Sequence, residues 1–227
     1  MKPKIYTGIL ALFCAATTAQ ANLLISPGFE TDPLNGYIAV LSDFVGNAGQ
    51  WGAESGTISL ATGGVTPPEG THMLSMTGSG TAYQTDQMTY VGSGPIASLI
   101  ASGNAVVHLS AFFNVGNEVS AGNSAVLVRF FNGADYNLNQ TGSVFNSLVL
   151  DADEKSWQMN SVSAAIPVGT IWIASELLYG ASSLGASPGF VDAADLTITA
   201  VPEPGTALFG IACVGVAAIR RRRKAAV

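Results

Sequence analysis

The sequence predicts an all-β domain, a jelly-roll β-sandwich, at residues 22–200. Long helical periodicity is absent from this span, and its short apolar runs are interrupted by Gly, Asn, Ser and Pro, which is typical of all-β proteins. Several runs alternate between apolar and polar residues, as half-buried strands do. Roughly eight to ten strands of this kind suit the two packed sheets of a jelly roll.

The predicted strands are distributed over the whole span. In chain order they are residues 57–61, 72–77, 81–90, 107–113, 125–131, 145–150, 161–166, 171–173 and 195–199. The alternation is cleanest in the last of these, where Leu196 and Ile198 should face the core. The apolar residues 107, 109, 111 and 113 should share one face of their strand, and the nearly continuous apolar run 125–131 is interrupted only by Arg129.

The composition sets limits on what the chain can be. Hydrophobic residues make up 48% of the 227 residues and charged residues 11%, which excludes a disordered chain. The two cysteines, Cys14 and Cys213, lie outside the predicted domain and exclude a disulfide-dense scaffold or a zinc site built from a cysteine cluster.

The charge is distributed unevenly along the chain. Between residues 22 and 201 only Arg129 and Lys155 oppose fourteen acidic residues, which gives this part a net charge of −12. Such a surface repels phosphate backbones, so we expect no nucleic-acid partner. The same charge favours divalent cations.

The N-terminus has the pattern of a secretory signal peptide. Lys2 and Lys4 precede an apolar run at 9–16, and Ala19-Gln20-Ala21 matches the A-x-A cleavage pattern. We therefore predict a signal peptide at residues 1–21, removed by signal peptidase to leave Asn22 as the first residue. An N-terminal membrane anchor is the alternative, although the run is shorter than the roughly 20 residues that span a bilayer.

The C-terminus combines three features within residues 201–227. Pro202, Glu203 and Pro204 precede an apolar stretch at 206–219, and a basic tail at 220–224 follows. The stretch would be about 21 Å long as a helix, against a hydrocarbon core of about 30 Å, so it predicts a weak transmembrane helix. The tail contains Arg220, Arg221, Arg222 and Arg223, which should remain cytoplasmic as a stop-transfer signal.

This order of features resembles the PEP-CTERM sorting signal of Gram-negative bacteria. The resemblance implies that an exosortase recognises and cleaves the segment while its helix is in the inner membrane. The protein would then reach the cell surface or be secreted, a fate often associated with exopolysaccharide. An ordinary C-terminal anchor behind a proline-rich linker is the alternative.

The domain itself resembles galactose-binding-like jelly rolls, which include many carbohydrate-binding modules. The resemblance is carried by short segments at 22–24, 28–30, 67–76, 83–85, 157–167 and 190–196. It implies a structural calcium ion held by Glu30 and Asp192, with Gly70 and Thr71 placed to supply carbonyl oxygens. In the alternative interpretation Glu30 caps a turn and Asp192 is simply solvated.

Candidate ligand-binding and catalytic residues are few. Trp51, in the loop-like sequence Gly49-Gln50-Trp51-Gly52, is the best candidate for a ring that stacks on a sugar, whereas Trp157 and Trp172 lie in strand patterns that favour the core. We predict no catalytic residue. The two histidines, His72 and His108, are too far apart for a local metal motif, and the sequence contains no G-x-S-x-G motif.

The sequence therefore predicts an exported, exosortase-sorted and non-catalytic module associated with extracellular polysaccharide or biofilm matrix. One alternative is a structural or adhesive surface protein that binds other proteins. A secreted polysaccharide hydrolase is a further alternative, and its acidic residues would then include the run Asp151-Ala152-Asp153-Glu154, which we interpret as a solvated turn.

Overall fold

The structure is a computed structural model that describes residues 21–30, 51–53, 56–62, 64–76, 82–116, 122–133, 139–180 and 188–201. The predicted signal peptide, except for Ala21, lies outside these residues. The Pro-Glu-Pro motif, the predicted transmembrane helix at 206–219 and the basic tail also lie outside them. Within the described part of the chain, no helix has the length and apolar character needed to cross a bilayer.

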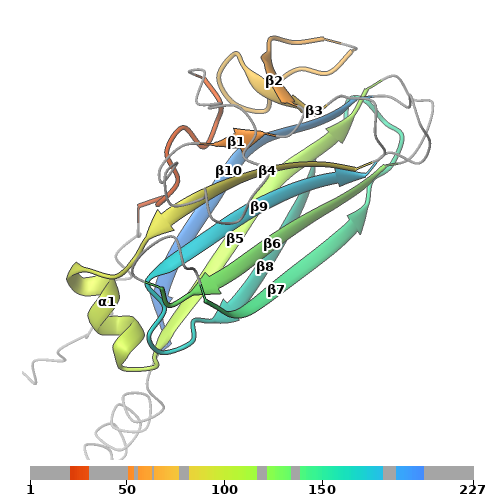
Figure 1. Ribbon diagram of the computed structural model, residues 1–227. Coiled ribbons are helices and arrows are strands. Elements are labelled where there is room, and N and C mark those ends of the chain that lie inside the picture. The colour runs from red at the N-terminus through yellow and green to blue at the C-terminus, as the bar shows by residue number, and fades with distance from the viewer. Residues whose placement is uncertain are drawn as a thin grey trace, which may run out of the picture.

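The described strands form two antiparallel sheets that pack face to face (Figure 1). The first sheet has the order β1-β4-β9-β6-β7 and the second has the order β2-β3-β10-β5-β8. The strands are β1 (Gly52–Ala53), β2 (Gly56–Ser59), β3 (Met73–Met76), β4 (Ala82–Tyr90), β5 (Ala105–Val115), β6 (Asn123–Phe131), β7 (Gln140–Val149), β8 (Gln158–Ala165), β9 (Trp172–Gly180) and β10 (Gly189–Ala200). The predicted all-β sandwich is confirmed, and its topology is similar to that of a jelly roll.

The core lies between the two sheets and follows from the alternation in the sequence. The predicted core positions Leu196 and Ile198 of β10 are completely buried, as are residues 107, 109, 111 and 113 of β5. Antiparallel pairing places these two strands side by side, with Leu196 opposite Leu109. From the first sheet, β6 and β9 add the buried residues Val126, Val128, Ile173 and Leu177.

One helix, α1 (Gly94–Ala101), closes an end of the sandwich and was not predicted. Ser93 occupies its N-cap position in an extended conformation, and a proline follows in the first turn, where its missing amide costs nothing. Ile96, Leu99 and Ile100 recur at helical spacing and pack against the core.

A β-bulge interrupts β10 directly after Asp192. The pairing of β10 with β5 shifts register between Asp192 and Asp195, and Ala193 has a φ of 48°. Such bulges reorient a side chain locally. The bulge lies beside the first described segment, because Ala194 donates its backbone amide to Pro27 O at 3.0 Å.

Candidate functional site

The first candidate site lies where the chain's first described segment meets the turn before β3. The carboxylate of Glu30 accepts hydrogen bonds from the backbone amides of Thr71 at 2.9 Å and His72 at 3.0 Å, and from the Thr71 hydroxyl at 3.1 Å. These donors, the His72 amide foremost, lower the pKa of Glu30 to about 2. Glu30 therefore stabilises this turn, as the alternative interpretation expected.

Asp192 has a different environment. It is completely buried, so the alternative interpretation of a solvated Asp192 is wrong. One carboxylate oxygen, Oδ1, accepts the Ala193 amide at 2.8 Å, while Oδ2 is buried without a hydrogen-bond partner. The pKa of Asp192 is raised to about 7, chiefly by burial, and the nearby carboxylates of Glu69 and Glu30 add to the shift while the backbone amides of Ala193 and Glu69 oppose it.

The structure thus brings the four residues predicted for calcium into one neighbourhood. Gly70 is required there, because its φ is +58° and a Cβ atom would collide with the carboxylate of Glu30. In the residues described, however, no set of three or more His, Cys, Asp or Glu side chains is gathered closely enough to hold a metal ion. A cation at this place would therefore depend on backbone carbonyl oxygens in addition to carboxylates.

Trp51 lies in the core, and the prediction that it offers an exposed ring to a sugar is wrong. Its side chain is completely buried and packs against Phe29, with 5.3 Å between ring centroids. The indole Nε1 donates to Ser26 O at 3.2 Å. The local glycines suggested an open loop, but Phe29 and Ser26 from a distant segment cover the ring.

A second candidate site, which sequence reasoning missed, is the outer face of the first sheet. We call it the β4-β9-β6 face and define it by the outward residues Asp86, Met88, Tyr90, Arg129, Phe131, Trp172, Ala174 and Glu176. Tyr90 and Phe131 both lie opposite Trp172, and Tyr90 meets it edge-on with 4.9 Å between ring centroids. Half of Tyr90 is exposed, whereas Met88, Phe131, Trp172 and Ala174 form a small buried cluster beneath it.

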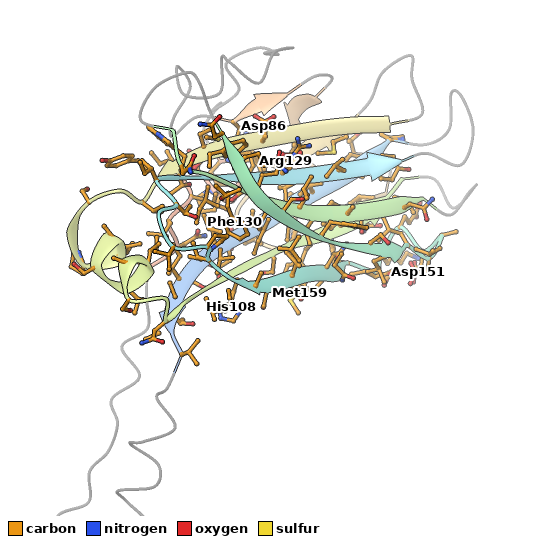
Figure 2. The ribbon with its side chains drawn as sticks, turned by 60° about the horizontal axis from the view of Figure 1, so that its bottom comes forward. Asp86, His108, Arg129, Phe130, Asp151 and Met159 are labelled. Atoms are coloured by element: carbon orange, nitrogen blue, oxygen red, sulfur yellow. The ribbon has the colours of Figure 1, made fainter. Side chains whose placement is uncertain are left out.

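An ion pair lies on the same face. Arg129 of β6 forms a bidentate ion pair with Glu176 of β9, with Nη2 3.1 Å from Oε2 and Nε 2.5 Å from Oε1. Glu176 is completely buried, and this burial raises its pKa, while the guanidinium of Arg129 opposes the shift. Asp86 of β4 lies directly opposite Glu176. Figure 2 shows Asp86 and Arg129 on one side of the core residue Phe130, with His108 and Met159 on the other.

His108, on the outer face of the second sheet, has a structural environment. Its Nδ1 is 2.7 Å from the Ser163 hydroxyl on β8, and its Nε2 is 3.1 Å from the Thr199 hydroxyl on β10. The imidazole therefore links three neighbouring strands by side-chain hydrogen bonds. This supports the interpretation that His108 is a structural residue.

The acidic run Asp151–Glu154 forms the turn between β7 and β8. Asp151 and Asp153 are exposed, and each accepts the backbone amide two residues ahead, at 3.2 Å and 3.0 Å. These are local turn hydrogen bonds of aspartate. The interpretation as a solvated turn accounts for both residues.

Comparison with known proteins adds two findings. Residues 200–224 match the family model of the PEP-CTERM protein-sorting motif. No curated protein sequence is significantly similar to this chain.

Solved structures with a similar fold include TmCBM61, a carbohydrate-binding module determined in complex with β-1,4-galactotriose. It has a TM-score of 0.50 and 14% identity over 79% of this chain and 99% of that chain. Another is a putative sugar-binding protein from Bacteroides thetaiotaomicron, with a TM-score of 0.50 and 12% identity over 79% of this chain and 100% of that chain. At this level of identity the likeness concerns the fold. The chain therefore carries a PEP-CTERM sorting motif C-terminal to a β-sandwich that has the fold of carbohydrate-binding modules.

Proposed function

We propose that this protein is an exported, non-catalytic module that binds a neutral polysaccharide on its β4-β9-β6 face, at the cell surface or in the extracellular matrix. The sorting motif at 200–224 supports the cellular part of the proposal, because such a motif marks an exported substrate that an exosortase processes at the membrane. The fold shared with sugar-binding proteins is consistent with the molecular part but does not establish it.

The observation that carries the binding proposal is that the half-exposed ring of Tyr90 lies on the same sheet face as the Arg129–Glu176 ion pair. A sugar presents apolar C–H groups on one side of its ring and hydroxyls at the rim. Tyr90, supported from below by Trp172, offers an aromatic surface for the apolar side. The partly exposed guanidinium of Arg129, held in place by the buried carboxylate of Glu176, offers charged donors for hydroxyls on the same face.

The charges of the domain select the type of polysaccharide. Arg129 is one of two basic residues between residues 22 and 201, and its guanidinium is already paired with Glu176. The remaining charge of the domain is strongly negative, so a uronate-rich or sulfated chain would be repelled. A neutral chain avoids that repulsion and still finds hydrogen-bond partners on the face.

A glycan array followed by titration calorimetry tests this proposal with the exported protein. We expect binding to one or more neutral polysaccharides, and we expect Tyr90→Ala to weaken it roughly tenfold or more, because an aromatic contact contributes on the order of 1–3 kcal/mol. Met159→Ala is the matched control, since Met159 is equally exposed but lies on the other sheet. Binding that is unchanged in Tyr90→Ala, or lost equally in the control, would contradict the assignment.

We also propose that a structural calcium ion binds beside Asp192. Asp192 Oδ2 is buried without a hydrogen-bond donor, and a cation would supply the missing partner. Glu30 would be the second carboxylate, and a cation would share it with the hydrogen bonds that it accepts from residues 71 and 72. The carbonyls of Gly70 and Thr71 would complete part of the 6–8 oxygens that calcium requires.

The ion would join β10 to the chain's first described segment and to the turn before β3. Because a ligand that binds only the folded state stabilises it by mass action, EDTA should lower the melting temperature of the wild type. The double variant Glu30→Gln/Asp192→Asn should melt at the same temperature with and without EDTA. A wild-type melt that EDTA leaves unchanged, with no metal found by elemental analysis, would refute this site.

A further inference from the structure

The two borders of the sandwich differ in a way that neither the sorting motif nor the sugar site explains. On one border the sheets end in very short strands, β1 with two residues and β2 with four. On the other border they end in β7 with ten residues and β8 with eight. Figure 1 shows β7 and β8 together along this second border, away from β1 and β2. Short edge strands resist pairing with other chains, whereas long ones invite it.

The long border also lacks charge. No charged residue occurs from 136 to 150 or from 156 to 175, although residues 22–201 together carry a net charge of −12. Edge strands are ordinarily protected by lysine or proline, and β7 and β8 contain neither. Two copies of this acidic protein would repel each other at most surfaces, and this border is where the repulsion is smallest.

The backbone of β7 is arranged for pairing on its free side. Leu150 donates its amide to Gly122 O at 2.8 Å, which identifies this pair as a hydrogen-bonded one in the ladder with β6. Hydrogen-bonded and non-hydrogen-bonded pairs alternate in antiparallel ladders. The amides and carbonyls of Ser143, Phe145 and Ser147 therefore point away from β6. In the described part of the chain no strand pairs with that side of β7.

The side chains of β7 add apolar surface to the same border. Phe145 and Val149 are each 69% exposed, and they lie on the outer side of the strand. They are the two most exposed large hydrophobic residues of the described chain. An uncharged edge with open backbone groups and exposed apolar side chains has the properties of a strand-pairing surface.

We propose that β7 pairs antiparallel with β7 of a second copy of this chain, so that the first sheets of the two copies form one continuous sheet. The occupant is a second copy, because β7 is itself an uncharged ten-residue strand and this border is where two copies of the acidic chain repel each other least. A two-fold axis would relate the two copies, so that each contributes the same strand to the interface, as in most homodimers.

The acidic turn after β7 determines the relative direction of the two strands. Asp151 and Asp153 follow the end of β7 and are exposed. Parallel pairing would place the two acidic turns next to each other. Antiparallel pairing places them at opposite ends of the joined strands, about 34 Å apart for ten residues, which is several times the Debye length of about 8 Å at physiological salt.

Sedimentation velocity of the exported protein tests the proposal. We expect a reversible monomer–dimer equilibrium that shifts toward the dimer as salt screens the residual negative charge. Ser147→Pro removes an outward amide and leaves the ladder with β6 intact, a position that edge strands tolerate. Because two hydrogen bonds are lost per dimer, the dissociation constant should rise roughly tenfold to a hundredfold.

Ser161→Pro on β8 is the matched control. Ile166 donates to Ala105 O at 2.9 Å, and the same alternation directs the Ser161 amide away from β5, so the substitution is equivalent but on the other sheet. It should leave the dimer unchanged. Ser147→Lys and Ser161→Lys repeat the comparison with the backbone intact, and melting curves verify that all four variants fold. A wild type that is monomeric up to its solubility limit, or dimerisation weakened equally by the β7 and β8 substitutions, would overturn the proposal.

Discussion

The substitution Trp51→Ala tests whether the ring that the sequence suggested for sugar binding instead stabilises the core. The indole is completely buried, stacks at a tilt on Phe29 and donates a hydrogen bond to Ser26 O. Truncating a buried Trp to Ala costs on the order of 3–5 kcal/mol, and the lost hydrogen bond of about 1 kcal/mol is included in that range.

Thermal unfolding followed by circular dichroism is the appropriate assay. For a domain of this size 1 kcal/mol shifts the melting temperature by roughly 2–4 °C, so Trp51→Ala should lower it by roughly 6–20 °C. Trp51→Phe retains an aromatic ring against Phe29, so its melting temperature should fall much less. Trp157→Ala is the control, because Trp157 is only partly buried and packs against a smaller cluster.

A different result would refute this reasoning. If Trp51→Ala melts within about 2 °C of the wild type, its ring contributes less than about 1 kcal/mol and is not a core residue. If the variant keeps its stability and loses glycan binding, the sequence-based assignment of Trp51 was right and the burial of the ring is misinterpreted.

Three further predictions concern the ion pair, a glycine and the sorting motif. Arg129→Met should lower the free energy of unfolding, measured with urea, by about 3–5 kcal/mol, because the buried carboxylate of Glu176 loses its cation. The double variant Arg129→Met/Glu176→Leu should recover most of that stability, and an equal loss in both variants would contradict a charge effect. Gly70→Ala should melt lower than Gly169→Ala, since both residues have a positive φ but only Gly70 adjoins the Glu30 carboxylate; equal melting temperatures would contradict this contact. Replacing residues 202–204 with alanines should retain the protein in the inner membrane, which cell fractionation can measure, and unchanged delivery would contradict a sorting role.

The strands could be predicted because their alternation is local. Val107 to Phe113 and the pair Leu196 and Ile198 show the period of two in adjacent residues, and burial follows from it directly. The helix α1 was missed because eight residues give too short a window for helical periodicity. The sequence Ser93-Gly94-Pro95 was the available signal, since a capping serine and an early proline are typical of helix starts.

The site residues could be predicted only in part, because their environments depend on contacts between distant segments. Arg129 was visible as a charge within an apolar strand, but its partner Glu176 is 47 residues away and is brought near by the register of β6 and β9. Asp192 lies next to a bulge that leaves no clear sequence pattern, and its burial was not predicted. Trp51 was misassigned because its covering residue, Phe29, belongs to another segment.

A crystal structure with an oligosaccharide bound is the most direct test of whether the β4-β9-β6 face binds a neutral polysaccharide. The oligosaccharide should be a fragment of whichever polysaccharide the exported protein binds on the array. A sugar ring should lie against Tyr90, with its hydroxyls within hydrogen-bond distance of Arg129. A sugar bound on the second sheet, or at the loops with Tyr90 uncovered, would show that the β4-β9-β6 face is not the binding site.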